Sequence, residues 1–350
     1  MIMMLFILTI IISAIVVGLS ARGIANYRLP RTQTSEEDLP SVSLLIPARN
    51  ETHTITRALT AATALNYPKL EIIVLDDQSQ DNTSEKIRSF AQDGVRFVAG
   101  EPLPEHWIGK NWATQQLSEH ASGEYLLFSD IDVQLSSKGL TRLMRAVVRH
   151  NLVGASLQPR LIPNSPLSAA AFPFLIWSTQ LLGRSHPKIH PSFGGLQLYR
   201  KSAWKQHGGF TRYKNDILAE FMLAKNFRRM GSFRFIRNSS ELGIAYIKSQ
   251  STLDGARMRY LRTLPSTSSI LFLLHIMCLI SPLMLLLIYP ILYPVIALAA
   301  AFILYNQHKY WLLCAILLPL AAVYELILLL GSALHTIFRP ASWKDRLISN

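Results

Sequence analysis

Hydrophobic residues form two long apolar runs at the ends of the chain and short runs between them. The long runs cover residues 1–21 and 269–332. An apolar helix of about 20 residues spans a hydrocarbon core of ~30 Å. The pattern therefore predicts an N-terminal transmembrane anchor over 1–21 and two to three transmembrane helices within 269–332.

The middle of the chain alternates short apolar runs with segments of helical periodicity. Expected strands are Ser41–Pro47, Leu70–Leu75, Val95–Val98 and Tyr125–Phe128, and expected helices are Thr54–Leu65 and Ser84–Gln92. Strands that alternate with helices are typical of a doubly wound, mainly parallel sheet. We therefore expect an α/β domain over residues 38–250.

Basic residues flank the apolar runs and suggest an orientation. Arg22, Arg28 and Arg31 follow the first run, and a basic linker (251–268) and a basic tail (333–350) flank the second. The positive-inside rule places the domain in the cytoplasm, so a multi-pass protein of the inner (plasma) membrane is expected. A cleaved signal peptide is the alternative, but no Lys or Arg precedes the first run.

The net charge of +13 raises the question of nucleic-acid binding. No basic stripe with interleaved aromatics and no zinc-ligand spacing accompanies it, so no nucleic-acid partner is expected. Lipid headgroups and sugar phosphates are the better partners for this charge. The two cysteines, Cys278 and Cys314, lie in apolar segments, which argues against a disulfide framework and a thiolate metal site.

Acidic residues follow two of the expected strands. Asp130 and Asp132 come after one strand, and Asp76, Asp77 and Ser79 come after another. Ligands of parallel sheets bind beyond the carboxyl ends of the strands. The first pair suits Mg²⁺ or Mn²⁺, which prefer oxygen ligands, and the second group suits ribose hydroxyls or a base edge.

Two phosphate-binding motifs are absent from the sequence. Pro104 and Asn111 break the pattern of a P-loop around Lys110, and no Gly-x-Gly-x-x-Gly opens the first helix. A nicotinamide cofactor is not expected. In the 76–83 loop, Asp81 or Thr83 is expected to cap the following helix.

Residues 43–51, 76–83 and 130–132, read together, resemble glycosyltransferase family 2, whose members are inverting enzymes with the GT-A fold. The resemblance implies a divalent metal held by Asp130 and Asp132. It also implies a set of residues that bind the nucleotide-sugar: Pro47, Arg49, Glu51, Asp76, Asp77, Ser79, Lys110 and Asp130.

Further matches lie on the acceptor side of the domain. Gly194, Gly195 and the later 208–210 segment are similar to the family's acceptor-side segments. Asn215-Asp216 falls where the family's acidic pair is expected, which implies that Asp216 is the general base. The alternative is that Asp216 caps a helix over residues 217–227.

A finer resemblance concerns the acceptor. Segments 102–113, 256–260 and 343–346 look like the membrane-bound branch that glycosylates carotenoid acids and the hopanoid-associated enzymes, although Asp345 replaces a usual glycine. Trp107 is then expected beside the sugar-diphosphate or acceptor, or else it packs on the core. No Gln-x-x-Arg-Trp motif occurs between residues 195 and 269, so a single transfer is expected.

The sequence thus predicts a non-processive, inverting glycosyltransferase that moves a sugar from a nucleotide-diphosphate donor, expected to be a UDP-sugar, to a carotenoid- or hopanoid-like membrane lipid. A polyprenyl-phosphate or ceramide sugar transferase stays open, as does a non-catalytic scaffold that binds nucleotide-sugar. A transporter is disfavoured because the apolar runs show neither charged pairs nor a repeat.

Overall fold

A computed structural model describes residues 39–158, 160–162, 194–216, 219–237, 242–246, 316–338, 342–343 and 346–347, with a few single positions between 276 and 290. The predicted anchor, the basic linker and most of the predicted membrane region lie outside these residues. The chain divides into two compact units, which are described separately: 28–160 with 188–245 and 340–350, and 1–27 with 161–187 and 246–339.

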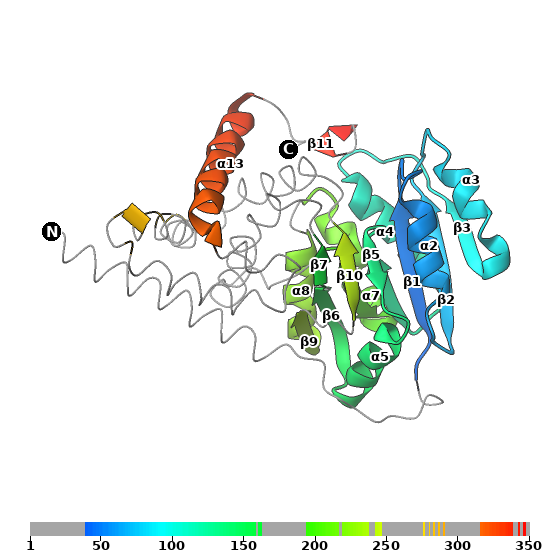
Figure 1. Cartoon of the computed structure of the whole chain (residues 1–350). Helices are drawn as coiled ribbons and strands as arrows, with labels where there is room; N and C mark the ends of the chain where they lie inside the picture. Colours follow the sequence, from blue (N-terminus) through cyan, green and yellow to red (C-terminus); the bar gives the residue numbers. More distant parts are fainter. Residues whose placement is uncertain are drawn as a thin grey trace. The chain divides into compact units, whose positions relative to one another are not determined.

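The first unit contains a seven-stranded sheet with the order β3-β2-β1-β4-β8-β6-β9 (Figure 1). Its strands are β1 (Val42–Ala48), β2 (Leu70–Asp76), β3 (Val95–Ala99), β4 (Tyr125–Ser129), β6 (Leu152–Gln158), β8 (Leu196–Arg200) and β9 (Ser232–Arg237). Strand β8 runs antiparallel to β4 and β6, and the other neighbours are parallel. The predicted α/β, mainly parallel fold is confirmed.

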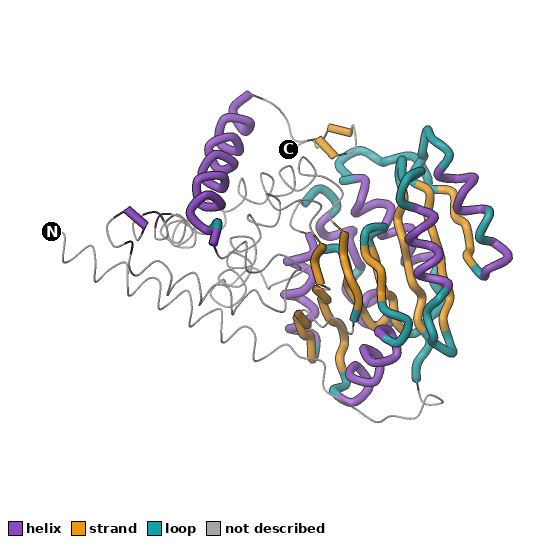
Figure 2. Tube along the Cα trace, viewed as in Figure 1, coloured by secondary structure: helices purple, strands orange, loops and turns teal. Residues whose placement is uncertain are grey.

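Helices pack against this sheet as Figures 1 and 2 show. They are α2 (Ile55–Thr63), α3 (Thr83–Arg88), α4 (Gly109–His120), α5 (Gly139–Arg149), α7 (Lys201–His207) and α8 (Ala219–Met230), with short 3₁₀ turns η1 (Ala91–Asp93) and η2 (Gly209–Tyr213). Helix α4 contacts β1 and β2, and α8 contacts β6 and β9. The helix expected over residues 84–92 is wrong in its second half, because the chain leaves α3 after Arg88 and turns again in η1.

The sequence pattern did not predict α4, and its composition explains why. Several of its buried residues are polar: Asn111, Thr114, Gln115, Gln116 and Ser118. These side chains form hydrogen bonds inside the protein, for example from the amide N–H of Phe210 to Oε1 of Gln115 at 3.0 Å. A helix that buries polar residues lacks the apolar stripe that periodicity detects.

One aromatic cluster joins β8, α7 and α8. Tyr199 and Phe227 are fully buried with ring centroids 4.4 Å apart, and Trp204 lies 5.0 Å from Tyr199. Buried aromatic side chains contribute large apolar areas to a core. The cluster therefore ties the end of β8 to α7 and to the C-terminal half of α8.

The remaining described elements are small. Strands β5 (Val133–Leu135), β10 (Gly243–Tyr246) and β7 (Arg160–Ile162) form a second sheet, and β11 (Ser342–Trp343) pairs antiparallel with β12 (Arg346–Leu347) across the 343–346 motif. Helix α13 (Leu318–Phe338) belongs to the other unit. Within the described part of the chain, no helix combines the length and apolarity needed to cross a membrane.

Replacing Gly209 by Ala should destabilise the protein far more than replacing Gly94. Both glycines have positive φ, but a Cβ at Gly209 would lie 2.5 Å from Oε1 of Gln115 and 2.7 Å from Trp204, whereas nothing lies within 4 Å of one at Gly94. We expect Gly94→Ala to cost about 1 kcal/mol and Gly209→Ala to cost ~3 kcal/mol or more. Denaturant unfolding of both variants measures this, and equal losses would contradict the packing described.

Candidate active site

The loops after β1 and β2 are bound to each other at the carboxyl edge of the sheet. Ala48 and Asp76 are paired in register, and the Asp77 amide donates to the Ala48 carbonyl at 2.8 Å. The Arg49 guanidinium donates to the carbonyls of Asp77 (2.5 Å) and Gln78 (3.1 Å). Arg49 and Asp77, both predicted to bind the nucleotide, therefore lie in two loops that are hydrogen-bonded to each other.

Further hydrogen bonds close these two loops. The amides of Asn50 and Glu51 donate to the hydroxyls of Ser79 (2.9 Å) and Thr83 (2.7 Å), and the Gln80 amide donates to Oδ1 of Asn50 at 2.9 Å. Asn50 has a φ of 51°, a conformation that Asn adopts more readily than most residues. The loops are held in one shape before any ligand binds.

Two acidic residues of the second loop have structural partners. Asp76, which is buried, accepts hydrogen bonds from the Ser84 hydroxyl and from the Ser79 amide at 3.3 Å. Burial alone would raise the pKa of Asp81, but hydrogen bonds from Thr83 and Thr52 outweigh it and lower that pKa to about 2. Asp81 accepts the amide N–H of Thr83, the first residue of α3, at 3.1 Å, but the N-cap residue of this helix is Asn82, so the predicted N-cap is wrong by one residue.

The Asp130-Ile131-Asp132 turn follows β4. Ile131 is buried, the Asp130 carbonyl accepts the Val133 amide at 3.0 Å, and the Asp130 amide donates to the Gly195 carbonyl at 2.9 Å. Because β8 is antiparallel to β4, its first residues lie at this same edge. The predicted metal pair and the predicted Gly194-Gly195 segment are therefore neighbours.

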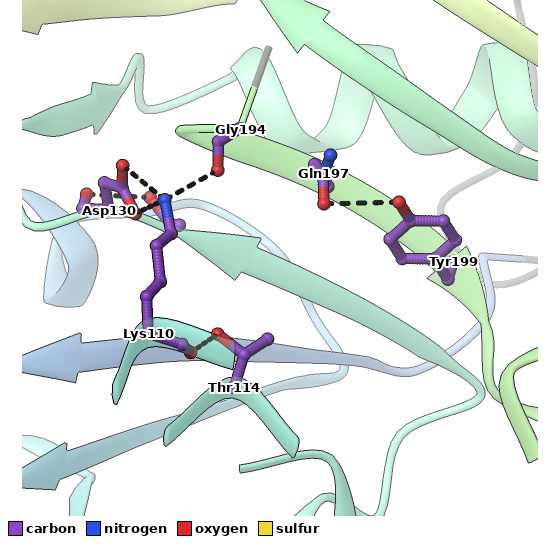
Figure 3. Close-up of polar contacts among 7 residues, drawn as sticks. Lys110, Thr114, Asp130, Gly194, Gln197 and Tyr199 are labelled. Carbon is purple, nitrogen blue, oxygen red and sulfur yellow. Dashed lines mark hydrogen bonds and ion pairs between the residues drawn. The ribbon is translucent and has the colours of Figure 1, made fainter. Parts of the chain in front are cut away.

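Lys110 connects these two segments, as Figure 3 shows. Its ammonium lies 2.8 Å from Oδ1 and 3.0 Å from Oδ2 of Asp130, and it donates to the Gly194 carbonyl at 3.2 Å. Lys110 stands in the first turn of α4, so a helix and not a loop positions it. The carboxylate oxygens of Asp130 and the carbonyl oxygen of Gly194 thus together bind one positively charged group, the Lys110 ammonium.

A small cavity of about 20 Å³, the space of about one water molecule, opens beside this ion pair. Among the residues that line it are Pro47, Lys110, Ser129, Asp130, Gly194, Gln197, Phe210 and Glu220. Oε1 of Glu220 would lie 2.2 Å from a Cβ at position 194, so a larger residue there would displace the Glu220 carboxyl.

Glu220 is the acidic residue that the sequence interpretation missed. Burial raises its pKa; Lys110 opposes this effect, whereas the charges of Asp130 and Asp216 add to it. The sequence did contain a signal, because Glu220 precedes Leu223, Ala224 and Phe227 by three, four and seven residues. All three are buried on α8, and an acid on the apolar face of a helix is a candidate for function.

Asp216, the predicted base, lies between η2 and α8 and is partly buried. Its carbonyl accepts a hydrogen bond of 3.1 Å from Nδ2 of Asn111, which also contacts the carbonyls of Tyr213 (3.0 Å) and Lys214 (3.3 Å). Since residues 217–218 lie outside the described residues, the predicted capping by Asp216 stays a prediction. Asp216 is close enough to Glu220 to influence its pKa.

Trp107 is partly buried against the aromatic core, and its ring lies 5.1 Å from that of Trp112. Its role beside the sugar or acceptor stays a prediction. In the described part of the chain, no group of three or more His, Cys, Asp or Glu side chains could hold a metal ion by itself. A metal at Asp130 and Asp132 would therefore need further ligands, such as phosphate oxygens or water.

These features define the class of protein. A mannosyltransferase from Pyrobaculum calidifontis, solved in complex with GDP-Man and Mn²⁺, superposes with a TM-score of 0.56 at 19% identity, covering 94% of this chain and 98% of that one. The domain thus has the GT-A fold. Residues 43–208 match the family model described as glycosyl transferase family 2, which identifies this part of the chain as a family 2 glycosyltransferase domain.

Two curated relatives are similar over part of their length. The 4,4'-diaponeurosporenoate glycosyltransferase of Staphylococcus haemolyticus is 27% identical over 201 residues, which is 55% of this chain and 53% of that protein. The beta-monoglucosyldiacylglycerol synthase of Trichormus variabilis is 29% identical over 154 residues, or 43% of this chain and 32% of that one. This chain thus spans about half or less of these relatives.

Replacing Thr83 by Val should loosen both nucleotide loops. The Thr83 hydroxyl is fully buried, accepts from the Glu51 amide and donates to Asp81. Its loss leaves a buried amide unsatisfied, for which we expect a cost of about 1–3 kcal/mol and weaker nucleotide binding. Calorimetry with UDP and GDP measures the binding. Thr60→Val on the exposed face of α2 is the control, and an equal effect in both would count against loop anchoring.

Proposed function

We propose that this protein is a metal-dependent, inverting glycosyltransferase that moves one sugar from a nucleoside-diphosphate sugar to a membrane lipid. The observation that carries the proposal is the pocket where Asp130, Lys110 and Glu220 meet. It combines a cation-binding carboxylate with a carboxyl of raised pKa, at the carboxyl edge beside two preformed loops.

The donor is proposed to bind along that edge. The 48–54 and 76–83 loops would receive the nucleoside, with Asp76, Asp77 and Ser79 directed to its base and ribose, and with Arg49 and Glu51 supporting the loop shape. Pro47 lines the small cavity beside Asp130, where the donor diphosphate would arrive. The structural neighbour from Pyrobaculum binds GDP-Man, whereas a UDP-sugar is our expectation for this chain.

A divalent cation, Mg²⁺ or Mn²⁺, is proposed to be held by Asp130 and Asp132. The fit rests on the donor set, since carboxylate oxygens of Asp130 and the Gly194 carbonyl already surround a positive charge. Such an ion supplies neutralisation of the charge that develops on the leaving diphosphate. The structural neighbour contains Mn²⁺.

The acceptor is proposed to be activated by Glu220 or by Asp216. The acceptor oxygen bonds to the anomeric carbon as the bond to the diphosphate oxygen breaks, and the carboxylate takes the acceptor's proton. Glu220 is favoured because it lines the same pocket as Asp130 and because a raised pKa strengthens a carboxylate as a base. An acceptor that is itself a carboxylate is already ionised near neutral pH and would not need this step.

The lipid acceptor and the membrane location are proposals supported by separate observations. One relative is named for a carotenoid acid and the other for a diacylglycerol product. Helix α13 exposes apolar side chains spaced three or four residues apart: Leu320, Val323, Ile327 and Leu330. This apolar stripe suits acyl chains. We propose a plasma-membrane protein, anchored by 1–21 and 269–332, with a cytoplasmic catalytic domain.

The assignment of the base is tested by Glu220→Gln and Asp216→Asn. Donor and a lipid extract are supplied with Mn²⁺, and the transfer of labelled sugar to lipid is measured. For a hydroxyl acceptor, we expect Glu220→Gln to lower kcat by about 10²–10⁴-fold and Asp216→Asn by ~5-fold or less, since Asp216 acts through charge. Asp93→Asn, in exposed η1, is the charge control.

A larger loss of kcat in Asp216→Asn than in Glu220→Gln would identify Asp216 as the base. Full activity of both variants with a purified carboxylic-acid lipid would identify a carboxylate acceptor. Nucleotide binding without transfer to any lipid, under any metal, would overturn the enzyme proposal in favour of a scaffold.

A further inference from the structure

The Lys110 ammonium is bound to Asp130, the carboxylate that is proposed to hold a metal ion. The ammonium contacts both carboxylate oxygens, at 2.8 and 3.0 Å, and one backbone carbonyl, that of Gly194, at 3.2 Å (Figure 3). Oxygen atoms in such a group are also what Mg²⁺ and Mn²⁺ select. A lysine that pairs with both oxygens of a metal-binding carboxylate is therefore a competitor for that metal.

The backbone at Lys110 is held in place by hydrogen bonds, whereas the ammonium group of its side chain is partly exposed to solvent. The Ile108 amide donates to the Lys214 carbonyl at 2.8 Å, and the Lys110 carbonyl accepts the Thr114 hydroxyl at 2.8 Å. The side chains of Lys110 and Asp130 keep 30% and 36% of their surface accessible. The flexible four-carbon stem of lysine allows the ammonium to move while the helix stays in place.

The charges around this point favour exchange of one cation for another. Asp130 and Asp216 are each close enough to Glu220 to act on it electrostatically, and Lys110 is the positively charged residue among those that line the cavity. A divalent cation on Asp130 would repel an ammonium held at the same carboxylate. The two cations cannot both keep their full contacts.

We propose that Lys110 is a placeholder cation: it holds Asp130 in position before the metal binds, yields to the divalent ion, and then serves the donor diphosphate. This inference rests on the metal-dependent function proposed above. It gives Lys110 two effects of opposite sign, since the same charge opposes the metal and attracts the phosphates. A lysine that only binds phosphate lacks the first effect.

Lys110→Met separates these two effects. Free Mn²⁺ is titrated into the full-length protein and followed by electron paramagnetic resonance, first without nucleotide and then with UDP or GDP at saturating Mn²⁺. We expect Mn²⁺ alone to bind on the order of tenfold more tightly, because repulsion between the cations is gone. Binding of the nucleoside diphosphate should weaken by about tenfold, because one charge-assisted contact is lost.

Lys205→Met removes one charge from the exposed face of α7 and should change neither affinity. Asp130→Asn is the control that shows whether the wild-type protein binds Mn²⁺ at this carboxylate. If Asp130→Asn abolishes Mn²⁺ binding but Lys110→Met leaves it unchanged or weakens it, the placeholder role is overturned and the proposed function stands. Failure of the wild-type protein to bind Mn²⁺ even with UDP and GDP would overturn both.

Discussion

The side chain of Asn111 makes one set of contacts on which the rest of the site depends. From the first turn of α4, its Nδ2 reaches the carbonyls of Tyr213, Lys214 and Asp216, about a hundred residues later in the chain. The amide is nearly buried, so breaking these contacts would leave polar groups unsatisfied in the interior. The same turn of helix carries Lys110, so one local structure positions both the ion pair and the chain that leads to α8.

The order of the strands explains why residues far apart in sequence meet at this turn. In a purely parallel sheet, the start of β8 would lie at the opposite edge from the end of β4. Because β8 is antiparallel to β4, Ser129 pairs with Leu196, and the Gly194-Gly195 segment lies against Asp130. The reversal therefore supplies the carbonyl that holds Lys110 and the glycine that admits Glu220.

Much of this fold could be predicted from the sequence because the central strands are continuous apolar runs. Strands β1, β2 and β4 and helix α2 were expected within one or two residues of their observed ends, and the acidic residues after β2 and β4 followed from those ends. The interlocked loops could not be predicted, since Thr83 and Asn50 act through hydrogen bonds to a loop some thirty residues away. Hydrophobic periodicity carries no information on such contacts.

Helix α4 and Glu220 escaped prediction for related reasons. Helix α4 buries amide and hydroxyl side chains, which hydrophobic periodicity predicts to be exposed to solvent. Glu220 is an acid among apolar positions of α8, where the same periodicity predicts a hydrophobic residue. Each choice has a cost in desolvation, which the internal hydrogen bonds of α4 offset and which Glu220 shows as a raised pKa. A fold that needed only a stable core would have used apolar residues at both places. That both departures converge on the cavity beside Asp130 is the strongest argument that this edge of the sheet was shaped by chemistry and not by stability.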